Sequence, residues 1–249
     1  YLLADPNRGR LYDLVACIGS EDALPPESRA VETTGVPFLR HPVRAFHRWM
    51  RAPLRDMGTR AFYDATMVAL LEELRPDLVV LAGYLYVLTA PMLAAHADRI
   101  VNVHHSDLTR QDDRGRPRYP GLRAVRDAIV AGEAETRATA HFVTEEVDGG
   151  PLLLRSWAFP VARLAEDAVG WDAESMLKAY AFAHQEWMLR AAWGPMLARS
   201  IELVAQGRVE VQGGTAWIDG APGPLELTAA GEVVSWPAYR PHARPEATN

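Results

Sequence analysis

Residues 78–106, LVVLAGYLYVLTAPMLAAHADRIVNVHHS, contain the pattern that decides the fold. The run 78–83 is continuously apolar, which is typical of a strand that is covered on both faces of a parallel sheet. A short helix is predicted over 91–97, and a second strand is predicted over 100–104. A strand, a helix and a strand at this short spacing predict one unit of an α/β fold.

Helical and strand patterns alternate on both sides of this segment. Residues 59–74 carry apolar side chains at helical spacing, which predicts an amphipathic helix. The series as a whole predicts an α/β fold with an open, mostly parallel twisted sheet and helices on both faces, in a Rossmann-like arrangement. The other predicted elements are strands over 13–18, 36–39, 139–144 and 152–159 and a helix over 121–131.

The C-terminal part of the chain has a different character. A long helix is predicted over 172–193, Gly194-Pro195 is expected to kink or break it, and a second helical piece runs to about residue 205. Gly213-Gly214 separates two short alternating segments, which predicts a β-hairpin. We therefore expect a catalytic domain over 1–205 and a hairpin with a tail over 206–249. The hairpin either pairs across a homodimer or covers the sheet.

Composition excludes several classes of protein. Of the 249 residues 49% are hydrophobic, enough for a core, and the formal charge of −6 offers no broad basic surface for nucleic acid. No run is long and apolar enough to span a membrane, so a cytoplasmic protein without membrane contact is expected. The single cysteine, Cys17, excludes an internal disulfide, and the histidines lack metal-ligand spacing, so no metal is expected. The opening residue Tyr1 suggests that the sequence begins inside a longer gene product.

Polar groups follow two of the apolar strands and define a candidate catalytic site. Asn102 and His104 point to the same face of their strand, because side chains two residues apart do so. An asparagine amide suits an oxyanion that forms on a carbonyl carbon, and an imidazole can accept the proton of an attacking amine or water. Asp148, in the next glycine-rich loop, could orient that imidazole and raise its pKa. These residue types predict acyl transfer by direct attack, without a covalent enzyme intermediate.

Four motifs in order resemble the folate-dependent formyltransferases, in particular those that act on glycinamide ribonucleotide in purine synthesis. They are residues 75–84 (RPDLVVLAGY), 102–106 (NVHHS), 119–122 (YPGL) and 147–151 (VDGGP). The resemblance implies that a formyl group passes from 10-formyltetrahydrofolate, the cosubstrate, to the amine of a small-molecule acceptor. It also implies that Asn102, His104 and Asp148 form the catalytic trio.

The same resemblance assigns binding residues by motif position. The folate is expected to lie against the backbone of the segment after the apolar strand, with contacts from the loop that precedes Asp148. The amine acceptor is expected near the YPGL motif and the long helix. The implied folate contacts are Leu85, Tyr86, Val87, Leu88, Leu93, Thr144, Glu145 and Val147, and the implied acceptor contacts are Arg118, Tyr119, Gly121 and Glu186.

Three departures from the family pattern bear on the substrate. The given sequence does not contain the family's opening strand and its Gly-Ser-Asn phosphate loop, which either precede Tyr1 or are lacking, and we expect Tyr1 to lie within the helix that would follow them. Residues 110–118 form an insertion with four arginines, which is either a solvated loop or a hint of a specialised amine bearing carboxylate or phosphate. The order His104-His105-Ser106 and the segment 138–141 resemble the related formyltetrahydrofolate hydrolase.

The sequence leaves alternatives to the transferase open. A hydrolase would use the same trio to release formate, and turnover without any amine would favour it. A folate-binding or assembly domain that lost its acceptor site is a third, non-enzymatic possibility. We expect His105 to support the site from behind or to lie at the surface, and His141 to be a hydrogen-bonded core histidine.

Overall fold

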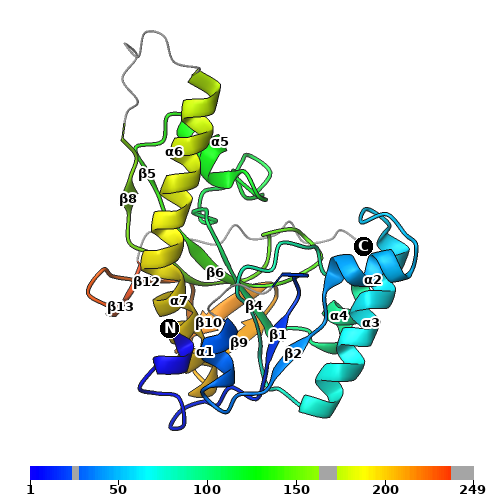
Figure 1. The fold of residues 1–249 in the computed structure, drawn as a ribbon. Helices are drawn as coiled ribbons and strands as arrows, with labels where there is room; N and C mark the ends of the chain where they lie inside the picture. Colours follow the sequence, from blue (N-terminus) through cyan, green and yellow to red (C-terminus); the bar gives the residue numbers. More distant parts are fainter. Residues whose placement is uncertain (24–27, 163–172, 237–249) are drawn as a thin grey trace, which may run out of the picture.

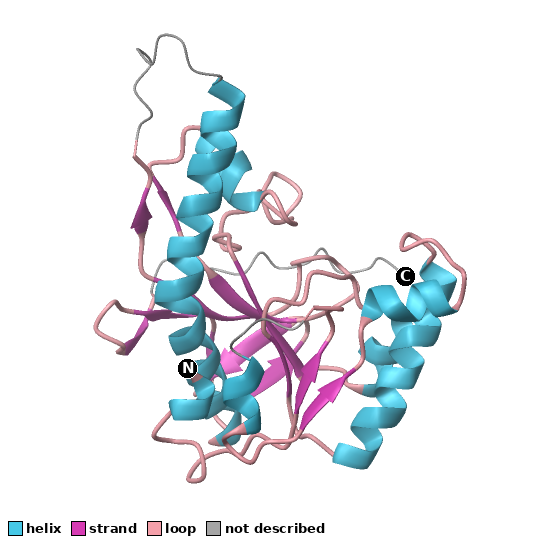
Figure 2. Cartoon of the chain, viewed as in Figure 1, coloured by secondary structure: helices cyan, strands magenta, loops and turns pink. Residues whose placement is uncertain are grey.

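The structure is a computed structural model, and it describes residues 1–23, 28–162 and 173–236. It is an α/β fold in which an open, twisted sheet is packed between helices (Figures 1 and 2). The strands are β1 (Cys17–Gly19), β2 (Phe38–Arg40), β3 (Val79–Leu81), β4 (Ile100–His104), β5 (Glu135–Thr136), β6 (Thr139–Phe142), β7 (Leu152–Ser156), β8 (Phe159–Pro160), β9 (Val209–Gln212), β10 (Thr215–Ile218), β11 (Ala221–Pro222), β12 (Leu225–Leu227) and β13 (Val233–Ser235). The helices are α1 (Ser28–Glu32), α2 (Val43–Trp49), α3 (Met57–Leu74), α4 (Ala90–Ala95), α5 (Ala124–Val130), α6 (Ala173–Met188) and α7 (Gly194–Ala205).

The main sheet has the strand order β13-β12-β7-β6-β4-β3. The predicted parallel pairing is found between β3 and β4, between β7 and β12, and in the separate pair β1–β2. Strand β6 runs antiparallel to both β4 and β7. The loop between β6 and β7 is too short to contain a crossover helix, and strands joined by a short loop pair antiparallel. The α/β class and the Rossmann-like sheet are confirmed.

Strand β4 separates two parts of the core and positions the candidate site. Val101 and Val103 point into the larger core cluster, which includes residues of α7, β6 and β7. Ile100 belongs to the second cluster, formed with residues of α3 and α4. Because side chains alternate along a strand, Asn102 and His104 lie on the same face of the sheet as Ile100. The strand therefore presents its two polar groups on the α3–α4 face.

The long C-terminal helix differs from the expected kinked helix. Helix α6 passes into a π-helical segment, Leu189–Trp193, and α7 follows directly with Gly194 and Pro195 at its start. Proline has no N–H to donate to the preceding turn, and the wider π turn before Pro195 accommodates this loss. A break at Gly194-Pro195 is not found, because α7 continues directly from the π segment, whereas the expected second helical piece to about residue 205 is confirmed. Helix α6 extends away from the sheet beside α5 (Figure 1).

The predicted C-terminal hairpin is confirmed. Strands β9 and β10 pair antiparallel, and the two residues that connect them, Gly213 and Gly214, both have positive φ angles. The segment predicted as a tail also contains β12, which pairs parallel with β7 and so extends the main sheet. No helix in the described part of the chain is long and apolar enough to cross a membrane.

Candidate active site

The three side chains of the predicted trio come from the ends of β4 and β6. Asn102 and His104 occupy the last part of β4, and Asp148 lies in the loop between β6 and β7. Asp148 has a left-handed backbone with φ of 56°. At Gly150 a Cβ atom would lie 1.9 Å from the carbonyl oxygen of Phe142. The loop can pass so close to β6 only with glycine at this position.

Asp148 lies against His104 and the loop that carries Gly121. His104 Nε2 is 3.5 Å from Asp148 Oδ2 and 3.4 Å from the carbonyl oxygen of Tyr119. The backbone N–H of Gly121 donates a hydrogen bond of 2.7 Å to Asp148 Oδ2. Both neighbours of Nε2 are acceptors, which assigns the proton of the neutral ring to Nε2 and leaves Nδ1 as the basic nitrogen.

Asn102 is held by a second histidine, His141, on the adjacent strand β6. The two residues are paired in the sheet register, and Asn102 Nδ2 lies 3.4 Å from His141 Nε2. His141 Nδ1 lies 2.9 Å from the carbonyl oxygen of Phe142, so Nδ1 carries the proton and Nε2 accepts from the amide. The expected core histidine thus orients the asparagine, and it also lies 3.8 Å from Asp148 Oδ1.

Burial dominates the titration of these histidines. It lowers the pKa of His104 below its ordinary value, while Asp148 and the hydrogen bond to the carbonyl of Tyr119 act to raise that pKa. Burial lowers the pKa of His141 to about 4, against the raising effects of the carbonyl of Phe142 and Asp148. His104 is therefore neutral near pH 7 and able to accept a proton.

A cavity of about 290 Å³ connects the trio to the expected folate segment. Its lining includes Asn102, His104 and Asp148. Seven of the eight implied folate contacts also line it: Leu85, Tyr86, Val87, Leu88, Thr144, Glu145 and Val147. Leu93 is not in the lining, because it packs into the core cluster between α3, α4 and the sheet.

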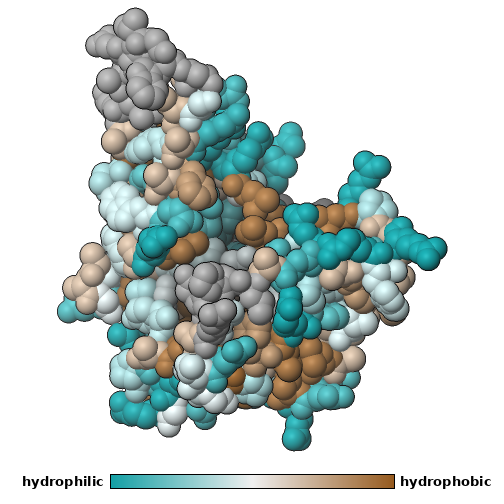
Figure 3. Space-filling view, viewed as in Figure 1, coloured by the Kyte–Doolittle hydropathy of each residue, from teal (hydrophilic) through white to brown (hydrophobic). Residues whose placement is uncertain are grey.

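The rim of the cavity is unusually apolar for exposed surface. Leu85, Val87, Leu122 and Val147 are each at least half exposed, and all four line the cavity. Apolar surface is also visible in the concavity between α6 and the α2–α3 side of the molecule (Figure 3). Large exposed apolar side chains that converge on one cavity indicate a binding site for a flat, partly apolar ligand.

The implied acceptor contacts are only partly brought together. Gly121 lines the cavity. Arg118 and Tyr119 direct their side chains to Glu133, at 3.3 Å and 2.8 Å, although the carbonyl of Tyr119 faces His104. Glu186 lies beside an open depression on the surface of α6, outside the cavity lining.

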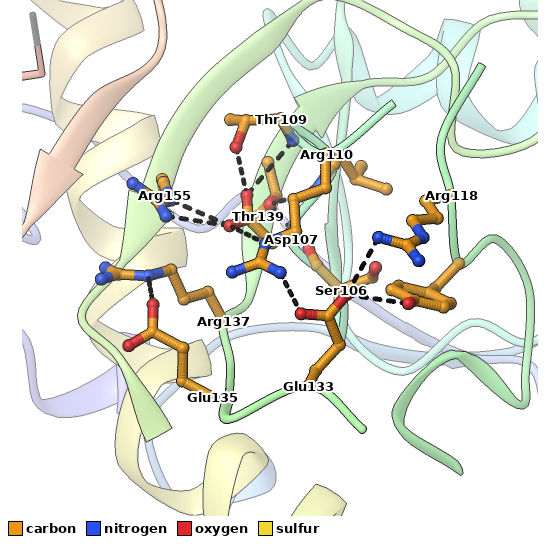
Figure 4. A network of polar contacts seen from close by, with 12 residues as sticks. Ser106, Asp107, Thr109, Arg110, Arg118, Glu133, Glu135, Arg137, Thr139 and Arg155 are labelled. Atoms are coloured by element: carbon orange, nitrogen blue, oxygen red, sulfur yellow. Dashed lines mark hydrogen bonds and ion pairs between the residues drawn. The ribbon is translucent and has the colours of Figure 1, made fainter. Parts of the chain in front are cut away.

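Three of the four arginines of the insertion, Arg110, Arg116 and Arg118, contact carboxylates of the protein itself. Arg110 and Arg118 both contact Glu133 (Figure 4). Arg116 forms two hydrogen bonds with Asp112. These contacts favour the structural interpretation of the insertion over direct recognition of an anionic substrate.

A buried ion pair anchors the start of the same loop. Arg155, on β7, donates two hydrogen bonds to Asp107 Oδ2 at 2.9 and 3.2 Å (Figure 4). Arg155 also lies 3.4 Å from Glu226 of β12 and stacks on the ring of Trp236 at 4.2 Å. The pair connects the segment after His104 to the C-terminal strands.

The sequence did not indicate two further lining residues, His105 and Trp193. Their ring centroids are 4.4 Å apart, and both residues belong to the lining of the cavity that holds the trio. His105 was expected behind the site or at the surface, and only the proximity of Trp193, from the far π segment, draws attention to it. Leu122 and Gln185 are two more lining residues that were not identified.

Comparison with known proteins places the chain in a family. The family model described as formyl transferase matches residues 18–191. Phosphoribosylglycinamide formyltransferase of Escherichia coli K12 is 30% identical over 174 residues, which cover 70% of this chain and 71% of the relative. Formyltetrahydrofolate deformylase of the same strain is 32% identical over 155 residues, covering 62% of this chain and 47% of the relative.

A solved structure supports the same assignment. Glycinamide ribonucleotide transformylase 1 from Symbiobacterium toebii superposes with a TM-score of 0.57 at 27% identity, covering 83% of this chain and 80% of the other. The chain therefore belongs to the formyl transferase family, and it is an enzyme of the folate-dependent formyltransferase class. The family's cosubstrate is a formyltetrahydrofolate. Among the described residues, no group of three or more His, Cys, Asp or Glu is arranged to hold a metal.

Proposed function

We propose that this protein transfers the formyl group of 10-formyltetrahydrofolate to the amine of a small-molecule acceptor by direct attack. The observation that carries the proposal is the contact of 3.5 Å between His104 Nε2 and Asp148 Oδ2, in a cavity that Asn102 also lines. A carboxylate, a buried neutral imidazole and an amide at one wall are the groups that such a transfer needs.

The cavity has the properties that a folate requires. Leu85, Val87 and Val147 provide exposed apolar surface at the rim, which suits the flat pterin ring. The segment 85–88 follows β3 and is not part of a helix or strand, so its backbone polar groups can bind the edge of the ring. When bound, the folate supplies the formyl group and a nitrogen leaving group.

Each residue of the trio has a distinct part in the transfer. The amine attacks the formyl carbon, a new C–N bond forms, and the bond from that carbon to N10 of the folate breaks. His104 accepts the proton that the amine loses, and N10 receives a proton as it leaves. The amide of Asn102 donates a hydrogen bond to the developing oxyanion, and Asp148 stabilises the protonated imidazole.

The proposal is tested by following 10-formyltetrahydrofolate in the presence and absence of amines. Glycinamide ribonucleotide is the first acceptor to test, because it is the substrate named for two of the relatives. Formation of a formylated amine supports the proposal. No consumption of the folate with any amine or with water would disprove it.

Hydrolysis is a second candidate function, favoured by the deformylase relatives and by the order His104-His105-Ser106. In that reaction water replaces the amine, and the same His104 accepts a proton of water. Release of formate at the same rate with and without amines would favour the hydrolase. A rate that depends on the amine concentration would favour the transferase.

A further inference from the structure

Two aromatic residues of the cavity lining take no part in the proposed reaction. They are His105, which follows His104 directly, and Trp193, from the π segment between α6 and α7. The rings are tilted by 34° with centroids 4.4 Å apart. We call these two residues the aromatic wall.

The chain departs from regular structure at the place where it builds this wall. A π-helical segment is uncommon and is frequently found at functional sites. Here it brings the Trp193 ring to the cavity beside Gly83, where a Cβ atom would be 3.9 Å from Cζ3 of the indole. Gly83 has a φ of 76°, a conformation that glycine adopts readily. The two features allow an aromatic ring to reach the end of β3.

Both rings of the aromatic wall have unsatisfied polar atoms. His105 Nε2 and Trp193 Nε1 are buried, and neither has a hydrogen-bond partner among the residues that the structure describes. Most buried polar atoms in proteins do have a partner, so each exception needs a reason. An indole N–H can only donate, and a neutral imidazole can donate or accept. Two such atoms beside a cavity indicate a ligand that offers hydrogen bonds there.

The charges around the cavity restrict the nature of that ligand. The charged residues of the lining are Glu145, Glu146 and Asp148, and this set of described residues contains no Lys or Arg. Burial and the neighbouring His104 lower the pKa of His105 to about 3, so this imidazole is uncharged near neutral pH. Carboxylates repel an anionic ligand, and uncharged rings do not neutralise its charge. The cavity therefore favours a ligand that is uncharged where it meets the aromatic wall.

We propose that the aromatic wall binds the body of the amine acceptor and selects an acceptor with an uncharged hydrogen-bonding group there, such as a carboxamide, next to a flat apolar part. The inference rests on the proposed formyl transfer and adds the chemical class of its substrate. The amine nitrogen of the acceptor then faces His104. The carboxamide oxygen of the acceptor accepts a hydrogen bond from Trp193 Nε1, and the carboxamide forms a second hydrogen bond with His105 Nε2. A carboxylate at the same position is disfavoured.

The test uses two amines that differ in one charge, phenylalaninamide and phenylalanine, with glycinamide ribonucleotide as a third. Formylated amine and formate are measured separately in one assay with 10-formyltetrahydrofolate. We expect kcat/KM to be at least tenfold higher for phenylalaninamide than for phenylalanine. A preference for phenylalanine, or equal kcat/KM for the two amines, would overturn the inference while leaving the formyl transfer intact.

Variants separate binding of the acceptor from folding and from folate binding. Trp193→Phe keeps a ring and removes the N–H, and His105→Leu removes both ring nitrogens. We expect each to raise the KM for phenylalaninamide about tenfold and to leave the KM for the folate unchanged. His105→Gln, which retains a polar group near the position of Nε2, should restore most of the loss, and Trp49→Phe is the matched control because Trp49 is exposed on α2.

The outcomes distinguish the two proposals. Unchanged KM values in Trp193→Phe and His105→Leu would overturn the role of the aromatic wall. Formate release without any formylated amine would overturn it too and would favour hydrolysis. If the unmodified protein forms neither formylated amine nor formate, the proposed function itself is contradicted, and the inference depends on that function.

Discussion

Two polar regions begin within a few residues of each other after β4 and differ in how their charges are satisfied. In the network around Asp107, Arg155 donates two hydrogen bonds to one carboxylate, and Arg110 and Arg118 share Glu133 (Figure 4). In the cavity around His104, the His–Asp contact is 3.5 Å, and His105 Nε2 and Trp193 Nε1 have no hydrogen-bond partner in the described part of the chain.

This difference shows which polar groups are free to act on a ligand. Charges that are paired within the protein hold the loop after β4 in position. Polar atoms that remain buried without partners cost stability, and they are retained where a ligand can satisfy them. Changes in the network should therefore affect folding, and changes in the cavity should affect catalysis.

The largest effect is expected for His104→Ala. Loss of the base should lower kcat/KM for formyl transfer about a thousandfold, within the range of general-base catalysis. The free energy of unfolding should fall by less than in Arg155→Met, because the imidazole is neutral and Asp148 keeps the hydrogen bond from the N–H of Gly121. Steady-state kinetics and urea unfolding measure the two quantities. Activity within tenfold of the unmodified protein would exclude His104 as the base.

The buried ion pair provides the opposite case. Arg155→Met leaves Asp107 without its main partner in a buried position, and breaking a buried pair on one side costs about 3 kcal/mol. We expect that loss in urea unfolding, with kcat close to normal for the protein that remains folded. A large fall in kcat without a change in stability would show that the network contributes to catalysis.

Asp148→Asn should lower kcat/KM about a hundredfold, because an amide does not stabilise the protonated imidazole. The carboxylate raises the pKa of His104. Its removal should therefore shift the acid limb of the pH–kcat/KM profile to lower pH. A shift to higher pH, or no shift, would contradict the contact between Asp148 and His104 as the basis of the effect.

The buried histidines predict a loss of stability in acid. Burial lowers the pKa of His105 to about 3, so below pH 6.5 the unfolded chain binds a proton that the folded chain does not. The free energy of unfolding should fall with decreasing pH by at most about 1.4 kcal/mol per pH unit from this histidine. His105→Leu should reduce the slope measured between pH 6.5 and 4.5. An identical slope in both proteins would show that His105 does not contribute.

The smallest effect is expected for an exposed ion pair of the insertion. Arg116→Met breaks the pair with Asp112 at the surface, where solvent screens the interaction. We expect an unchanged urea midpoint and unchanged kinetics for every acceptor. An increase in the KM for an acceptor with a phosphate group would instead support the interpretation that this insertion binds an anionic substrate directly.

Local sequence patterns anticipated the elements that carry the trio. The strand 100–104 was predicted with the bounds of β4, and the spacing of Asn102 and His104 required a shared face. The glycine-rich loop of Asp148 was recognised from its motif. The position of β12 was not anticipated, because a strand of three residues next to turn residues has too little periodicity to be distinguished from a tail.

The positions of individual side chains could not be predicted either. Arg118 was assigned to the acceptor by motif position, yet its side chain lies at Glu133. Leu93 was assigned to the folate, yet it packs in the core. A motif specifies where the backbone runs, whereas a flexible side chain goes to whichever partner the neighbouring elements offer.

By itself, the order of residues determined the α/β class, the strand that ends at His104 and the types of chemical group available at its end. These properties depend on periodicity and on contacts between residues close in the chain. Only the tertiary structure decided that Trp193 meets His105, that Arg110 and Arg118 contact Glu133, and that the cavity lining is acidic and neutral. Such contacts depend on how distant elements pack, which no local pattern encodes.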